Sequence, residues 1–159
     1  MLLDNALALR DQYRSALLDD VLPFWMRHSP DRECGGFFTC LERDGRVFDT
    51  DKFVWLQGRE TWLFSTCCTA IAPRPAWLEM ARLGAEFLRD HGCDAAGDFY
   101  FALDRRGAPL VQPYNIFSDC FAAMAFAAYG RASGAGWAGA LAVRTFERIL
   151  ARWDNPKGR

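Results

Sequence analysis

The sequence contains few of the residues that metal sites and disulfide frameworks need. Only two histidines occur in 159 residues, and the six cysteines include no Cys-x-x-Cys pair. The usual spacings of a zinc site are therefore absent, and we expect no metal. The N-terminal segment has acids inside its apolar region and no small-residue cleavage site, so it does not resemble a signal peptide. We therefore expect a cytoplasmic protein whose cysteines are reduced and packed as small hydrophobic side chains.

The chain also lacks an excess of one charge and a long hydrophobic run. Nineteen basic and twenty acidic side chains nearly cancel, which disfavours nucleic acid or an anionic membrane surface as a partner. The most apolar run, residues 120–129, is about half as long as the roughly 20 residues that a membrane span requires. The sequence holds no phosphate-binding loop, dinucleotide fingerprint or nucleophile elbow. We expect neither a nucleic-acid nor a membrane partner.

What the chain does contain is a short motif in two copies. Residues 35–45 read GGFFTCLERDG, and residues 97–107, which lie 62 positions later, read GDFYFALDRRG. Each copy is typical of a short strand that is closed by an acidic-basic-glycine turn. Helical patterns lie on both sides, so the repeated unit is a helix, a connection with a small hairpin, and a helix. Periods of this size indicate stacked units, none of which can bury its hydrophobic face alone.

Hydrophobic residues make up 51% of the chain, enough for one domain with a core, and their spacing predicts an all-α fold. We expect helices over residues 4–27, 52–70, 75–90 and 115–131, and a last one from about 137 that fades at DNPKGR. Pro23 should bend or interrupt the first helix. Asp49, Thr50 or Asp51 should cap the second, and Gly92 should end the third. Helix pairs of this kind suggest an α/α solenoid or toroid. Two and a half units would leave an apolar open side, so we expect the N-terminal part of a longer protein.

Two segments, residues 24–65 and 115–134, resemble the N-acylglucosamine 2-epimerase family, which includes the renin-binding proteins and the cellobiose 2-epimerases. The pattern Lys-x-x-Trp-x-Gln-x-Arg at residues 52–59 makes the resemblance specific. It covers almost the whole chain and implies an (α/α)6 barrel of twelve helices. Residues 1–159 would supply about five helices, as the N-terminal part of one domain with short β-hairpins in the helix connections. The family's two catalytic histidines lie in the later half, so they are expected beyond Arg159.

The resemblance implies a sugar 2-epimerase that interconverts N-acetylglucosamine and N-acetylmannosamine, or a related free sugar, without a cofactor. This reaction removes the proton at C2 and returns it to the other face, which requires a base, an acid and donors for the oxygen that gains charge. An aldose-ketose isomerase on the same fold and a non-catalytic protein of the renin-binding type are the alternatives. His28 and His91 follow helices, where a cation is favoured by the dipole, and we assign neither as the base. We expect the 159 residues alone to be inactive, and the resemblance leaves a homodimer open.

Arg59 is the first candidate for sugar binding. Trp55 lies four residues before it and Trp62 three residues after it, on nearly the same helix face. A guanidinium among aromatic rings is either stacked and paired as a structural element or directed into a pocket. The resemblance favours the pocket, because the arginine of this pattern contacts sugar oxygens in the family.

Trp55, Phe117 and Tyr114 complete the predicted sugar-binding set. Trp55 and Phe117 are equivalent in the repeat and could form apolar walls for a sugar ring, although core packing is the commoner role of such aromatics. Related enzymes carry a pocket tyrosine near the start of the fourth helix. Phe117 takes that position here, with Tyr114 one turn earlier. Lys52 could point towards the pocket mouth, but we favour an ammonium group that extends to solvent at a helix start.

Overall fold

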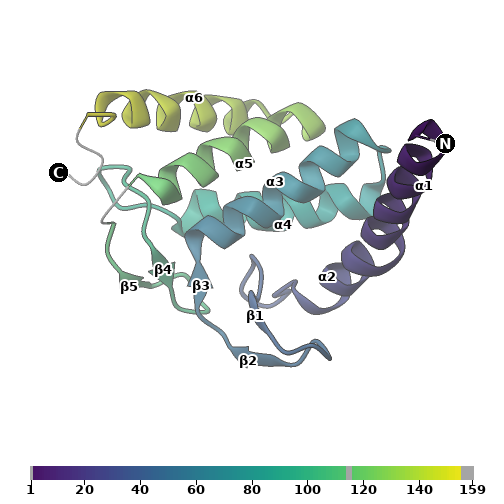
Figure 1. The fold of residues 1–159 in the computed structure, drawn as a ribbon. Coiled ribbons are helices and arrows are strands. Elements are labelled where there is room, and N and C mark those ends of the chain that lie inside the picture. The colour runs from purple at the N-terminus through teal and green to yellow at the C-terminus, as the bar shows by residue number, and fades with distance from the viewer. Residues whose placement is uncertain (1, 114–115, 155–159) are drawn as a thin grey trace.

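The structure, a computed structural model, describes residues 2–113 and 116–154 (Figure 1). All the expected helical segments are present. The helical elements are α1 (Leu2–Ser15), η1 (Ala16–Val21), α2 (Leu22–His28), α3 (Val54–Ala70), α4 (Pro75–His91), α5 (Phe117–Ser133) and α6 (Gly136–Ala151). The strands are β1 (Cys40–Leu41), β2 (Val47–Asp49), β3 (Lys52–Phe53), β4 (Ala102–Leu103) and β5 (Pro109–Val111). Among the described residues, no helix combines the length and apolar character that crossing a bilayer requires.

The first helical segment contains the interruption expected from Pro23. Between α1 and α2 the chain forms η1, a π-helical turn that ends two residues before the proline. Proline has no N–H to donate, and its ring clashes with the carbonyl four residues earlier. The wider turn of a π-helix accommodates that clash without ending the segment. The segment therefore curves along one edge of the molecule, beside α3 and the first hairpin (Figure 1).

The predicted start of the second helix at Lys52 is wrong. Residues 52 and 53 form β3, which pairs with β4, and α3 begins at Val54. Phe53 precedes the helix in extended geometry and makes no capping hydrogen bond through its side chain, so none of the expected capping residues caps α3. The pairing partner lies about fifty residues away in the sequence, and a local pattern cannot reveal such a strand.

Helices α3 and α5 lie side by side, with α4 packed on α3 and α6 packed on α5 (Figure 1). Gly58 permits the close approach of α3 and α5, because a Cβ atom at this position would lie 2.8 Å from the carbonyl oxygen of Phe121. Both hairpins lie at the end of the molecule where α3 and α5 begin (Figure 1). The site described below therefore lies at one end of a layer of two parallel helices.

The core repeats with the sequence. Each of two hydrophobic clusters takes one phenylalanine from a copy of the repeated motif and one from α3 or α5, and both include an aromatic residue from α4. Phe37 and Phe64 belong to the first cluster, and Phe99 and Phe126 to the second. An apolar groove of about 490 Å³ lies on the outer side of α5 and α6. This groove matches the apolar open side expected from the repeat.

The two histidines occupy equivalent places beneath the hairpin turns. Gly45 and Gly107 adopt φ values of +88° and +92°. A Cβ atom would lie 2.2 Å from Nδ1 of His28 at the first glycine and 2.4 Å from Cγ of His91 at the second. Each imidazole also contacts a phenylalanine ring four residues earlier in a tilted arrangement, with ring centroids 4.9 and 5.0 Å apart. Both histidines therefore support the turns as packing elements.

Candidate functional site

Arg59 lies on an exposed face formed by α3 and α5. Its guanidinium carbon is 5.7 Å from the ring centroid of Trp55 and 5.8 Å from that of Phe121. The two ring centroids are themselves 6.0 Å apart. Arg59 makes no hydrogen bond or ion pair with any described residue, so the structure does not support a role in tying loops together. A guanidinium held on two rings with its donors unused is suited to bind oxygen atoms of a ligand.

The structure brings Trp55 together with Arg59 as the spacing predicted. Phe121 was not among the predicted site residues, yet the repeat offset of 62 pairs it with Arg59, and that signal could have identified it. Phe117 begins α5, is 68% exposed, and lies one turn before Phe121. Tyr114 lies outside the described residues. The assignment of Trp55, Phe117 and Tyr114 to a sugar stays a prediction.

A groove of about 360 Å³ extends from Arg59 along the side of α3 that faces α2 and the first hairpin. Its lining residues are Trp25, Thr39, Leu56, Arg59, Glu60, Trp62 and Leu63. Arg59 is thus shared between the α3–α5 face and this groove. The groove contains two indole rings, from α2 and α3, and one carboxyl group. Arg59 and Trp62 of this groove were expected from the sequence, and Glu60 was not.

Glu60 is the buried ionisable group of the groove. Its residue exposure is 9%, and the Ser29 hydroxyl donates a hydrogen bond to Oε1. Burial raises the pKa of Glu60 to about 8, and the Ser29 hydrogen bond opposes the rise only in part. The carboxyl is therefore mostly protonated at neutral pH and can both donate and accept hydrogen bonds. The position of Glu60 directly after Arg59 was the only sequence signal for its place in the groove. Its burial could not be predicted, because it depends on contact with the end of α2.

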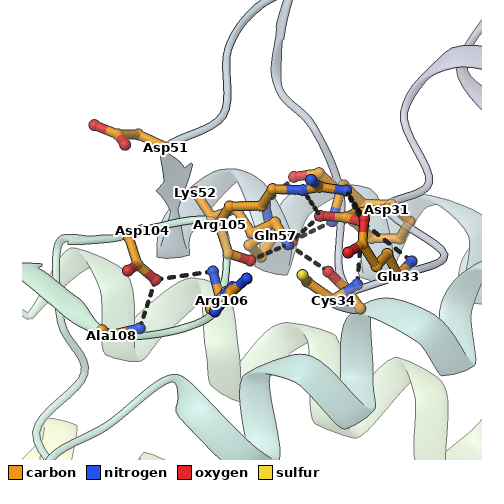
Figure 2. A network of polar contacts seen from close by, with 12 residues as sticks. Asp31, Glu33, Cys34, Asp51, Lys52, Gln57, Asp104, Arg105, Arg106 and Ala108 are labelled. Atoms are coloured by element: carbon orange, nitrogen blue, oxygen red, sulfur yellow. Dashed lines mark hydrogen bonds and ion pairs between the residues drawn. The ribbon is translucent and has the colours of Figure 1, made fainter.

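The Lys52 ammonium group is buried, so the prediction that it reaches solvent is wrong. Figure 2 shows its Nζ among acceptors from three segments: it lies 3.0 Å from Asp31 Oδ2, 2.6 Å from the Gly35 carbonyl oxygen and 2.7 Å from the Arg105 carbonyl oxygen. Those acceptors replace water around the cation, which allows complete burial. Burial lowers the pKa of Lys52, and the hydrogen bond with Asp31 opposes that change.

Asp31 joins this Lys52 cluster to the second hairpin. The guanidinium of Arg105 donates to both of its carboxylate oxygens, with Nε 2.9 Å from Oδ2 and Nη2 3.2 Å from Oδ1 (Figure 2). Burial alone would raise the pKa of Asp31, but hydrogen bonds from Arg105, Lys52 and the Cys34 N–H together lower it to about 2. The carboxylate therefore stays charged at neutral pH. Lys52, Asp31 and Arg105 therefore link the segments that carry the first and second hairpins, at the end of the molecule where α3 and α5 begin.

Gln57 holds the first hairpin on α3, two residues before Arg59. Its Oε1 accepts the Phe37 N–H at 2.7 Å, and its Nε2 donates to the Phe37 carbonyl at 2.8 Å. Both groups of the side-chain amide are thereby used on one buried residue. This contact fixes the hairpin against the helix turn that carries Arg59.

The described residues offer no centre for a metal ion. Residues 2–113 and 116–154 contain no group of three or more histidine, cysteine, aspartate or glutamate side chains placed to hold one. The guanidinium of Arg59, held on two rings, suits this face to bind a neutral or anionic ligand rich in oxygen.

Known proteins match the chain over most of its length. A family model described as N-acylglucosamine 2-epimerase (GlcNAc 2-epimerase) matches residues 36–159. The chain is 44% identical over 121 residues to the N-acylglucosamine 2-epimerase of Bos taurus, a match that covers 74% of this chain and 29% of that protein. It is 39% identical over 147 residues to the N-acylglucosamine 2-epimerase of Mus musculus, which covers 89% of this chain and 35% of that protein.

A solved structure shows the same arrangement of helices. The cellobiose 2-epimerase from Spirochaeta thermophila DSM 6192 superposes with a TM-score of 0.82 at 31% sequence identity, covering 91% of this chain and 36% of that one. The chain thus spans about a third of the length of the relatives that it matches.

Proposed function

The chain belongs to the N-acylglucosamine 2-epimerase family, and we propose that it forms the sugar-binding edge of a sugar 2-epimerase. Its fold is that of the first helices of an (α/α)6 toroid, as the sequence predicted. We propose further that residues 1–159 are the N-terminal part of one such barrel domain. The proposed substrates are N-acetylglucosamine and N-acetylmannosamine or a related free sugar. The names of the bovine and mouse relatives support this choice.

One observation carries the proposal: Arg59 is stacked on two aromatic rings and has no protein acceptor among the described residues. Removal of the C2 proton places negative charge on the neighbouring oxygen, and a fixed guanidinium is suited to stabilise that charge. Trp55, Phe117 and Tyr114 are proposed as the walls of the same site. Rings on either side of the cation would also exclude water and strengthen its interaction with the sugar oxygen.

The two proton transfers need a base and an acid on opposite faces of the sugar. The described residues include only two imidazoles, and both are packed beneath glycine turns. We therefore assign neither histidine to proton transfer. The role proposed for this part of the protein is to bind and orient the substrate and to stabilise its developing charge.

The reaction class can be tested by proton exchange. The protein that contains this chain is incubated in heavy water with N-acetylglucosamine or N-acetylmannosamine, and the products are followed by NMR. We expect deuterium at C2 together with formation of the other epimer. A ketose formed from an unsubstituted aldohexose, without epimer formation, would support the isomerase instead. Binding of sugar without exchange would support a non-catalytic protein.

Replacing Arg59 tests its place in the reaction. Arg59→Gln removes the charge while keeping a side chain that can hydrogen-bond, and we expect kcat/KM to fall about 100- to 1,000-fold, as for other donors to a developing oxyanion. Because Arg59 makes no hydrogen bond to the described residues, the free energy of unfolding should change by less than about 0.5 kcal/mol. Activity within threefold of wild type would contradict the proposed role.

A further inference from the structure

Glu60 presents a carboxyl oxygen to the groove beside Arg59. The Ser29 hydroxyl binds Oε1, and no other hydrogen bond joins this carboxyl to any described residue. Glu60 is nevertheless 9% exposed and lines the groove, which leaves Oε2 directed to that space. Oε2 is not among the fully enclosed side-chain atoms that lack a partner, so it keeps contact with the groove and is available to a ligand group.

The fold does not depend on this carboxyl. The Ser29 hydroxyl has one proton, and its Oγ also lies 2.8 Å from the Trp25 carbonyl oxygen, which can accept that proton in place of Oε1. The Ser29 N–H donates to the same carbonyl oxygen at 2.9 Å. The Ser29 carbonyl in turn accepts the Phe38 N–H. The end of α2 is thus secured without Glu60, whose ionised form is disfavoured by burial. An ionisable group that the local structure does not need, placed in a groove, is typical of a binding site.

The rest of the groove suits a sugar ring. Trp25 and Trp62 provide indole surfaces for apolar C–H faces, and Arg59 provides donors for oxygen atoms. The volume of about 360 Å³ is within the range of small-molecule sites. Residues 59 and 60 project about 100° apart on a helix, so their polar groups approach a ligand from two directions.

We infer that the Glu60 carboxyl hydrogen-bonds a ring hydroxyl of the sugar held by Arg59, with Trp25 and Trp62 on either side. The inference rests on the proposed function, which supplies the class of ligand. Glu60 then acts in specificity as well as in affinity, because a buried carboxyl left unpaired disfavours a sugar without that hydroxyl.

Glu60→Met and Glu60→Gln test the inference in the protein that contains this chain. Methionine fills a similar volume without polar atoms, so we expect the Kd for N-acetylglucosamine to rise about 10-fold, as for loss of one good hydrogen bond. Unfolding midpoints should stay equal or rise, because Ser29 keeps its bond to the Trp25 carbonyl. Glutamine keeps an acceptor for Ser29 and a donor for the groove, so Glu60→Gln should retain affinity within about threefold.

Deoxy sugars that each lack one ring hydroxyl identify the contact. One of them should bind wild type about 10-fold more weakly than the parent sugar and should bind Glu60→Met no more weakly than the parent sugar. If Glu60→Met lowers the unfolding midpoint and leaves every Kd unchanged, the residue is structural and the inference is wrong.

The Arg59→Gln variant separates failure of this inference from failure of the proposed function. If wild type binds sugar and Arg59→Gln weakens binding while Glu60→Met does not, only the role of Glu60 is refuted. If wild type binds none of these sugars, the ligand class is wrong and both proposals fall.

Discussion

The two repeats share their backbone scaffold and differ in the polar groups placed inside it. In the first, the Glu42 N–H donates to the Arg46 carbonyl at 2.8 Å, and in the second the Asp104 N–H donates to the Ala108 carbonyl at 2.8 Å. The histidine-glycine contact beneath each hairpin is also repeated. The architecture therefore needs the same turn geometry twice, whatever the side chains around it do.

The contact that holds each hairpin on its helix differs in charge. Gln57 both accepts from and donates to the backbone of Phe37. Its equivalent Asp119 accepts only the Phe99 N–H, at 3.5 Å, and its Oδ2 is buried without a hydrogen bond, 3.9 Å from Arg152 Nη1. The first repeat thus holds its hairpin with a neutral amide. The second uses a carboxylate, and the few hydrogen bonds and the distant Arg152 do not fully offset the cost of burying its charge.

The exposed face differs in the same way. Arg59 lies on the first repeat, and its equivalent on the second is Phe121, on whose ring it stacks. One copy therefore supplies the charge and the other supplies the surface that holds it. The comparison indicates that a duplicated unit can gain a binding site by changing its side chains while its turns stay the same.

Replacing Lys52 should lower the free energy of unfolding more than any other change considered below, because Lys52 is the centre of the cluster with Asp31 and Arg105. Lys52→Met removes the buried cation and leaves two backbone carbonyls and part of the Asp31 carboxylate without their donor. We expect a loss of about 3–5 kcal/mol in the free energy of unfolding, measured by urea denaturation. Arg46→Met, at an exposed ion pair with Glu42, should change it by less than about 1 kcal/mol. A loss below 1 kcal/mol for Lys52→Met would mean that the cluster is not important for stability.

Alanine at the two turn glycines tests whether the scaffold is truly repeated. Gly45→Ala and Gly107→Ala each place a methyl group against an imidazole at positive φ. We expect each to cost about 2–4 kcal/mol, from backbone strain and overpacking together. Gly134→Ala is the matched control: it also has positive φ but meets no atom within 4 Å, so it should cost about 1–2 kcal/mol. Losses that differ strongly between the first two variants would show that the copies do not share this support.

Exchanging the neutral and charged side chains at Gln57 and Asp119 should change the free energy of unfolding least. Burial raises the pKa of Asp119, and the Phe99 N–H and Arg152 oppose the rise. A carboxyl with a raised pKa binds its proton more tightly in the folded state. Its favourable contribution is therefore complete below the unfolded pKa of about 3.9 and is lost as pH rises through the folded pKa. Asp119→Asn should remove this loss and make the protein about 1 kcal/mol more stable near pH 7, with little difference near pH 3.

The reverse change in the first repeat is the control. Gln57→Glu removes the donor to the Phe37 carbonyl, so it should destabilise the protein at neutral pH and less so in acid. Urea denaturation at pH 3, 5 and 7 measures both variants. A less stable Asp119→Asn at pH 7 would show that the pairing with Arg152 outweighs the burial of the charge.

Much of this fold follows from local patterns. The third helix was predicted over residues 75–90 and runs over Pro75–His91, because its apolar spacing, leading proline and following glycine agree. The start at Lys52 was wrong because β3 exists through its pairing with β4 rather than through local preference. Elements defined by distant partners were the ones that the sequence could not show.

Some residues of the candidate site could likewise be predicted from local sequence, and others could not. Arg59 and Trp55 could be found from helical spacing and from the family resemblance. Glu60 was missed because its burial depends on Ser29, 31 positions earlier in the chain. The buried state of Lys52 depends on Arg105, 53 positions later. Residues whose environment comes from another segment have no signal in their own neighbourhood.

The cluster of Lys52, Asp31 and Arg105 has a consequence for the order in which the two units fold. Its acceptors include the carbonyl of Arg105, and its carboxylate is clamped by the side chain of that same residue, 74 positions after Asp31. During synthesis the earlier unit is exposed while this arginine has not yet been made. Lys52 then has only Asp31 and the Gly35 carbonyl as partners, and Asp31 lacks its guanidinium. The first unit can therefore become fully rigid only when the second docks on it, which makes the pair, rather than the single unit, the smallest cooperative piece of this molecule.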